Sequence, residues 1–145
     1  MKKNIGLGLL MGLIMMTVSC GAADLNKVEA EMTPPLNKLT ELLNGTIDKI
    51  GTITNADEIV TALNTASEGA AAIVSELKLI ENKYNLNDAE SAKLLKMMTK
   101  PADDLTKAGE KLGKTVDDIL LKFDDEEVKN KIHQARMNLA YSLSM

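Results

Sequence analysis

Few side chains in this sequence have the types and spacing that chemistry requires. His133 is the only histidine and Cys20 the only cysteine, so neither has a partner of its own kind to share a metal ion. Four consecutive acids, Asp124 to Glu127, could attract a cation, but a calcium loop alternates its acids around a glycine bend. Acidic residues are also favoured in the first turn of a helix, where they oppose the helix dipole. We therefore interpret the acidic run as a helix start and His133 as structural.

No other motif of a catalytic or cofactor site is found. The segment Gly109 to Lys114 has two glycines and two lysines, but it lacks the spacing of a phosphate-binding loop and lies within a helical pattern. No Ser-His-Asp or Cys-His set is recognisable. The sequence predicts no catalytic residue, no metal site, no cofactor and no enzymatic activity.

The residues that precede Cys20 indicate its role. Two lysines follow Met1, an unbroken apolar run extends from Ile5 to Met16, and small or β-branched residues follow as Thr17-Val18-Ser19. A charged start, a short apolar run and a small-residue zone form the layout of an export signal. We predict that residues 1–19 are a signal peptide.

The end of this signal, Thr17-Val18-Ser19-Cys20, resembles the lipobox of bacterial lipoprotein precursors. Ser19 and Val18 match the family pattern, whereas Thr17 stands where leucine is usual. The resemblance covers Met1 to Cys20 only. It implies that Cys20 becomes the N-terminus, carries acyl chains such as palmitate and anchors the protein to a membrane. Gly21, in place of the aspartate that retains some lipoproteins at the inner membrane, implies the outer membrane or the cell surface.

Two alternatives to the lipid anchor remain. Ordinary signal cleavage after Ala22 or Ala23 would release a periplasmic or secreted protein without a cysteine. An uncleaved membrane anchor is the other alternative, but the apolar run is shorter than the ~20 residues that a membrane span needs.

Composition limits the partners of the mature chain. Cleavage before Cys20 leaves 126 residues, enough for one domain, and removes two of the 17 basic residues against 21 acids, for a net charge of −6. This balance excludes nucleic acid, which binds clustered Lys and Arg. With no Trp, two Tyr and one Phe, the chain also lacks the aromatic residues that dominate many binding hot spots.

Apolar residues recur at helical spacing along the whole mature chain. After the lipidated cysteine and a spacer, Asp24–Met32 is predicted to form a short helix, and Thr33-Pro34-Pro35 to interrupt it, because proline removes amide donors. This divides the chain into residues 20–33 and a bundle domain over residues 34–145. Four helices are predicted there, over Pro34–Ile53, from Ala56 to Tyr84, over Asp88–Phe123 with a kink at Pro101, and from the acidic run to Met145.

The second of these helices has the clearest pattern. Its apolar residues form two rows spaced by seven, which is typical of a helix packed along its length; the rows are Ile59, Ala66, Ile73, Ile80 and Leu63, Ala70, Leu77, Tyr84. Gly69 lies in the interior of this helix, where glycine is destabilising. We therefore expect Gly69 to allow close packing against a neighbouring helix. A hairpin with the following helix would place Ala70 opposite Ala102, next to the kink at Pro101.

The predicted fold is an all-α antiparallel bundle of about four helices. The predicted function is that of a lipid-anchored bacterial envelope protein, attached to the membrane through Cys20, with a binding or structural role. One alternative is a periplasmic carrier that holds a small apolar ligand among its methionines. Another is an oligomeric coiled-coil scaffold assembled through the seam of the second helix.

Overall fold

The computed structural model describes residues 23–145, so Cys20 and the signal segment lie outside the described residues. The described chain is helical and contains no strand, which confirms the all-α class. Five helices follow one another: α2 (Leu25–Thr52), α3 (Ala56–Tyr84), α4 (Asp88–Met97), α5 (Thr99–Leu120) and α6 (Glu126–Ser144).

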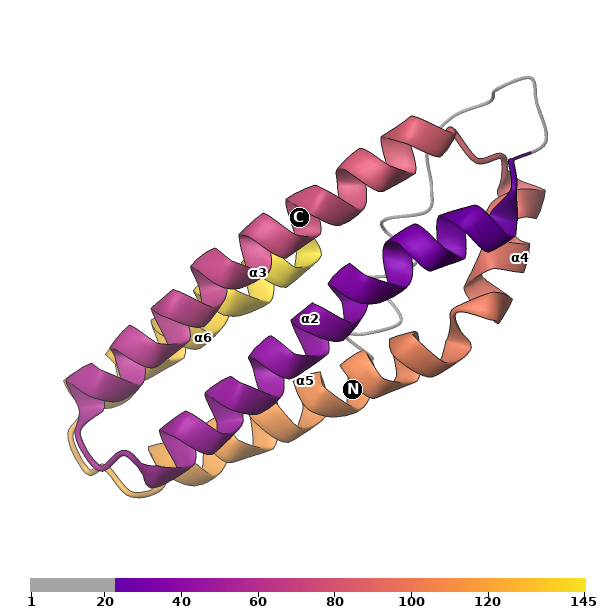
Figure 1. Ribbon diagram of the computed structural model, residues 1–145. Helices are drawn as coiled ribbons and strands as arrows, with labels where there is room; N and C mark the ends of the chain where they lie inside the picture. Colours follow the sequence, from indigo (N-terminus) through magenta and orange to yellow (C-terminus); the bar gives the residue numbers. More distant parts are fainter. Residues whose placement is uncertain (1–22) are drawn as a thin grey trace.

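The long helices lie side by side along one axis (Figure 1). α2 packs against both α3 and α5, whereas α6 packs mainly against α3 and contacts α5 much less. α2 and α5 run in one direction and α3 and α6 in the other, so the most extensive contact, between α3 and α6, joins parallel helices. Ser67 of α3 and Ser142 of α6 meet across this contact, with their hydroxyl oxygens 2.7 Å apart.

Polar residues at the helix starts explain where the helices begin. Asp24 and Asn55 are the N-caps of α2 and α3, and both accept backbone N–H groups of the first turn. Asn87 and Glu90 form a reciprocal capping box at the start of α4. The predicted helix starts at Asp24, Ala56 and Asp88 are confirmed to within one residue. Asn85 ends α3 in the left-handed conformation, with φ of 52°, which asparagine tolerates better than most residues.

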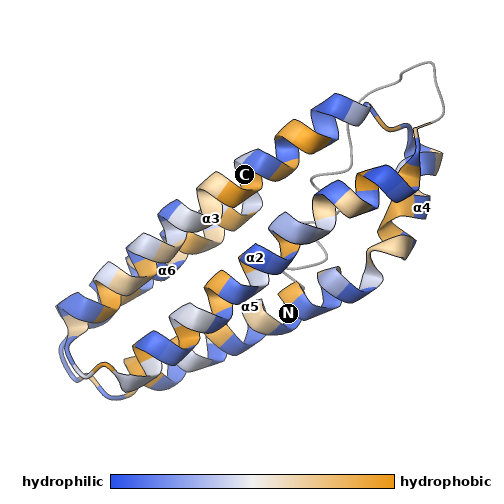
Figure 2. Cartoon of the chain, viewed as in Figure 1, coloured by the Kyte–Doolittle hydropathy of each residue, from blue (hydrophilic) through white to orange (hydrophobic). Residues whose placement is uncertain are grey.

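The core is a continuous apolar layer formed by the inward stripes of all five helices (Figure 2). On α3 the first heptads follow the predicted rows, but Ile73 and Ile80 are only partly buried and Val74 is fully buried instead. A straight helix has 3.6 residues per turn, so a seven-residue row drifts by about 20° per heptad. This drift moves the buried face of α3 off the predicted row.

The predicted interruption at the proline pair (Pro34 and Pro35) is wrong. α2 is continuous through both prolines, and the expected boundary between residues 33 and 34 falls inside it. An interior proline costs about 3 kcal/mol or more, but each buried aliphatic side chain stabilises by about 1.5–3 kcal/mol. The apolar stripe stays in phase across the pair, with Met32, Pro35 and Leu36 all buried. Packing on both sides therefore outweighs the lost backbone bonds.

The predicted continuous helix through Pro101 is also not observed. α4 ends at Met97 and α5 begins at Thr99, with Met98 between them at φ −91° and ψ 12°. Pro101 lies in the first turn of α5, where a missing N–H costs little. In a regular α-helix its ring would clash with the carbonyl of Met97, four residues earlier. The backbone therefore departs from the helix three residues before the proline.

The predicted hairpin that placed Ala70 opposite Ala102, next to Pro101, is wrong as well. α3 makes its main contacts with α2 and α6 and not with α4 or α5. Gly69 of α3 faces α2 instead. A Cβ atom on Gly69 would lie 3.2 Å from a methyl group of Leu42, so this glycine allows close approach of the two helices.

Candidate functional site

The residues that the sequence singled out do not form one site. Cys20 lies outside the described residues. His133 is exposed on α6. Within residues 23–145, no group of three His, Cys, Asp or Glu side chains is placed to hold a metal ion.

The acidic run forms the start of α6, as the sequence predicted. Asp125 is the N-cap, and its carboxylate accepts the N–H groups of Glu127 and Val128. Glu126 pairs with Lys129 at 2.8 Å, and Glu127 pairs with Lys131 at 2.9 Å. The run is thus used in helix capping and in surface ion pairs.

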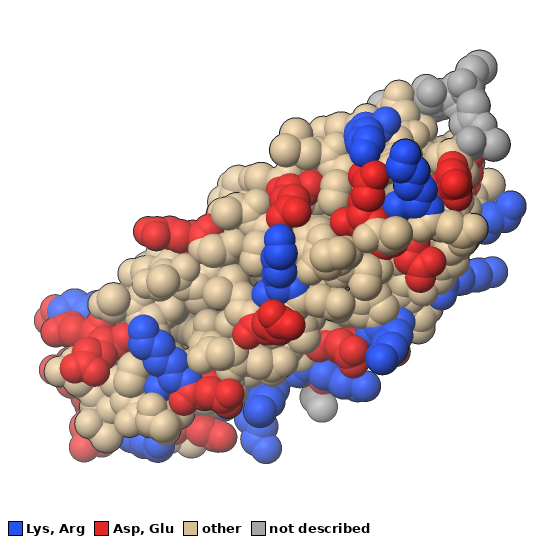
Figure 3. Space-filling model, viewed as in Figure 1, with Lys and Arg blue, Asp and Glu red and all other residues tan. Residues whose placement is uncertain are grey.

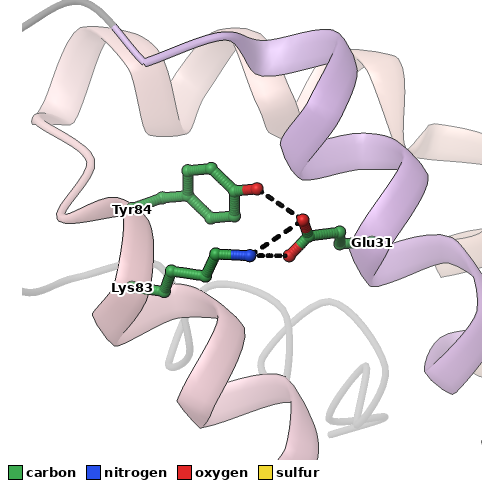
Figure 4. Close-up of polar contacts among 3 residues, drawn as sticks. All are labelled: Glu31, Lys83 and Tyr84. Atoms are coloured by element: carbon green, nitrogen blue, oxygen red, sulfur yellow. Dashed lines mark hydrogen bonds and ion pairs between the residues drawn. The ribbon is translucent and has the colours of Figure 1, made fainter.

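A polar cluster that the sequence did not reveal joins α2 to α3. We call Glu31, Lys83 and Tyr84 the Glu31 cluster. In Figure 4 the Glu31 carboxylate points at the other two side chains. Lys83 Nζ donates to both of its oxygens, at 2.9 and 2.8 Å, and the Tyr84 hydroxyl donates to Oε1 at 2.7 Å. The Lys83 ammonium also lies 5.0 Å from the centre of the Tyr84 ring, within the range of a cation–π contact.

Electrostatics in the cluster favour its charged, hydrogen-bonded form. Hydrogen bonds from Lys83 and Tyr84 lower the pKa of the Glu31 carboxyl. The hydrogen bond to Glu31 raises the pKa of Lys83, and it raises the pKa of Tyr84 in the same way. At neutral pH the cluster therefore holds a carboxylate, an ammonium and a neutral phenol. Neither the lysine nor the tyrosine is activated as a nucleophile, so the arrangement ties two helices together.

The groove beside the cluster is open to solvent. It has a volume of about 350 Å³ and combines charged and aliphatic groups along α2 and α3, namely Glu31, Glu76, Leu79, Ile80 and Lys83. A second groove of about 230 Å³ lies further along the same two helices, beside Leu42 and Gly45. Small-molecule sites bury most of their ligand, and these grooves are too open to do so.

A second polar contact fixes the first described residue. The backbone N–H of Ala23 donates to Glu90 Oε1 of α4 at 3.0 Å, while Oε2 accepts the N–H of Asn87 at 3.0 Å. Hydrogen bonds from these two backbone groups, first that of Asn87, lower the pKa of Glu90. The carboxylate of Glu90 therefore caps α4 and holds the start of α2 against it.

One carboxyl group has a strongly perturbed pKa. Glu81 follows Leu77 by four residues on the buried stripe of α3 and is partly buried itself. Desolvation raises its pKa to about 7. Burial disfavours the charged form of a carboxyl group, so Glu81 titrates near neutral pH.

No protein-family model, curated protein or solved structure matches this chain. The described helices include none that is both long enough and apolar enough to cross a membrane.

One-dimensional patterns could not have found the Glu31 cluster. Its members lie 52 and 53 residues apart, and Tyr84 was predicted only as the last member of an apolar row. The spacing of Asn87 and Glu90 is a local signal for the capping box, but it carries no information about the contact of Glu90 with Ala23.

Proposed function

We propose that this protein is a lipid-anchored lipoprotein of the bacterial cell envelope, with Cys20 as the lipidated residue and a helical bundle that acts by binding or as a structural element, without catalysis. The single observation that carries the proposal is the export-signal layout that ends at the only cysteine of the chain. The outer membrane or the cell surface is the proposed location, and lipid on Cys20 is the proposed attachment.

The start of the bundle supports this proposal. Asp24 caps α2 only four residues after Cys20, so a lipid on that cysteine would connect to the bundle almost without a linker. Glu90 and the Glu31 cluster hold this first part of α2 against α4 and α3. Because these contacts fix the first part of α2 to the rest of the bundle, a lipid on Cys20 would be attached to a well-held part of the domain.

We further propose that α4 and α5 form one kinked helical segment, so that the bundle consists of four helical segments. Hydrogen bonds continue across their junction, from Met98 N–H to the Leu94 carbonyl and from Ala102 N–H to the Met98 carbonyl. Met98 is fully buried, which keeps the apolar stripe in phase through the bend.

The other two functions have less support. A carrier of an apolar ligand needs an enclosed apolar cavity, whereas the grooves between α2 and α3 are open. For an oligomeric scaffold, a second copy bound through the seam of α3 would have to displace α2 or α6, which already pack there.

Fractionation of cells that express the full chain tests the proposal. We expect the wild-type protein in the membrane fraction and Cys20→Ser in the soluble fraction, because lipid chains contribute about 0.8 kcal/mol per buried CH₂ to membrane binding. Thr17→Leu is the matched control. It supplies the residue that is usual in a lipobox, so it should keep the protein in the membrane fraction. Unchanged partitioning of Cys20→Ser would contradict the lipid anchor.

A further inference from the structure

We propose that the bundle stands on the membrane by one end, with the turn between α3 and α4 facing the lipid headgroups and the junction of α5 and α6 pointing away. This orientation rests on the proposed lipid anchor at Cys20. It also assigns a membrane-facing surface, made of the first turns of α2 and α4 and the turn over residues 85–87.

The covalent distance from Cys20 to the bundle is short. Cys20 is three residues from Ala23, and three residues span at most about 11 Å in any conformation. The Ala23 N–H is itself bound to Glu90 in the first turn of α4, beside the turn that follows α3. A lipid on Cys20 is therefore confined to this end of the bundle.

Polar contacts hold the start of α2 firmly against α3 and α4. The Glu31 cluster joins α2 to α3 about two turns after Asp24, and Glu90 joins the start of α2 to α4. α2 has 28 residues, which corresponds to about 42 Å at 1.5 Å per residue. An anchor fixed at one end of such a rod leaves the other end several nanometres from the headgroups when the bundle stands upright.

Charge is distributed unevenly between the two ends of the bundle. At the far end, residues 48–58 and 117–131 contain nine acids and four lysines, whereas at the anchor end residues 23–31 and 81–96 contain six acids and four lysines. In Figure 3 the far end, at the lower left, carries many acidic side chains with lysines among them, and the anchor end carries both charges as well. Anionic headgroups repel the more acidic end over about one Debye length, roughly 8–10 Å. Charge therefore favours the upright orientation over one in which the far end touches the membrane.

One surface would favour a different orientation. α6 exposes Met137, Tyr141 and Met145 on the side away from the core, and their exposed fractions are 51%, 68% and 52%. Contact of this strip with lipid would lay the bundle on its side. The experiment must therefore distinguish the anchor end, the far end and α6.

Energy transfer from single labels to the membrane makes this distinction. The only native cysteine is the proposed lipid site, so an introduced thiol can be labelled alone. Three exposed positions without a capping role carry the donor dye in separate full-length lipidated proteins: Ala89→Cys at the anchor end, Thr54→Cys at the far end and Met137→Cys on α6. The proteins are placed in phosphatidylethanolamine–phosphatidylglycerol vesicles that contain a headgroup-linked acceptor.

We expect transfer to be strongest from position 89, weaker from position 137 and weakest from position 54. Equal transfer from all three positions, strongest transfer from position 137, or strongest transfer from position 54 would overturn the upright orientation while leaving the lipid anchor intact. Failure of the proteins to float with the vesicles would instead overturn the anchor, and the orientation with it. Flotation is scored separately from energy transfer, so the two failures are distinguishable.

Discussion

Two proline regions of this bundle behave in opposite ways. The proline pair lies in the interior of α2, yet the helix continues through it. Pro101 stands alone, yet α4 and α5 separate at Met98 just before it. The apolar stripe stays in phase at both places, so phase alone does not decide whether a helix continues.

The difference lies in the surroundings of each region. α2 is the central helix and packs against α3, α4 and α5, so residues on both sides of the proline pair are held by neighbours. α4 packs mainly against α2 and α5, and it has ten residues. A helix held along its whole length keeps its path despite lost backbone bonds, whereas a helix with fewer contacts bends. Intrinsic propensity is thus overridden where packing is strongest.

The largest expected effect comes from removing the packing that holds α2 through the proline pair. Leu36 follows the pair and is fully buried. Leu36→Ala should lower the free energy of unfolding by about 2–5 kcal/mol, as for other buried leucines. Asn37→Ala, at the exposed neighbouring position, should change it by less than about 0.5 kcal/mol. Urea unfolding of the two variants measures both values, and equal losses would show that packing does not hold this segment.

The next effect comes from the prolines themselves. Pro34 is exposed, so its replacement loses little packing and restores an N–H for the carbonyl of Ala30. Pro34→Ala should raise the free energy of unfolding by about 1–3 kcal/mol. Pro101→Ala, in the first turn of α5, should change it by less than about 1 kcal/mol. Thermal and urea unfolding measure both effects. If Pro34→Ala and Pro101→Ala stabilised the protein equally, the two proline regions would not differ in the way proposed.

A pH-dependent effect is expected from Glu81, whose pKa is raised to about 7 from its ordinary value of 4.5. The folded protein favours the protonated carboxyl, so stability falls as the pH rises from about 4.5 through 7. Glu81→Gln should leave stability unchanged near pH 4 and increase it near pH 8. Glu76→Gln, at an exposed position on the same helix, is the control. A parallel response of the two variants between pH 4 and 8 would refute this assignment.

The smallest effect concerns the Glu31 cluster, which holds the part of α2 before the proline pair. The pKa of Glu31 is lowered, so its contribution to stability is present above about pH 4.5 and is lost as the pH falls through the folded value. Glu31→Gln should lower the melting temperature slightly at pH 7, and this difference from the wild-type protein should shrink as the pH falls below 4.5. Glu29→Gln, two residues earlier, is the control. Hydrogen exchange should also become faster in residues 25–33 of Glu31→Gln, and unchanged exchange would mean that the cluster does not hold this segment.

Much of the fold could be predicted from sequence because it depends on local signals. The cap residues Asp24, Asn55 and Asn87 act within one turn, and the stripe from Leu36 to Ile50 follows helical periodicity. The proline outcomes and the partners of α3 could not be predicted, because they depend on which helices pack together. The Glu31 cluster depends on the same tertiary choice. Cys20 lies outside the described residues, so the anchor rests on the sequence alone.

The mass of the mature N-terminus tests the central claim most directly. The protein is purified from membranes, digested, and its N-terminal peptide measured by mass spectrometry. We predict that this peptide begins at Cys20 and carries a glyceryl group with acyl chains. An unmodified peptide that begins at Ala23 or Asp24, or one that retains Met1, would contradict the lipid anchor.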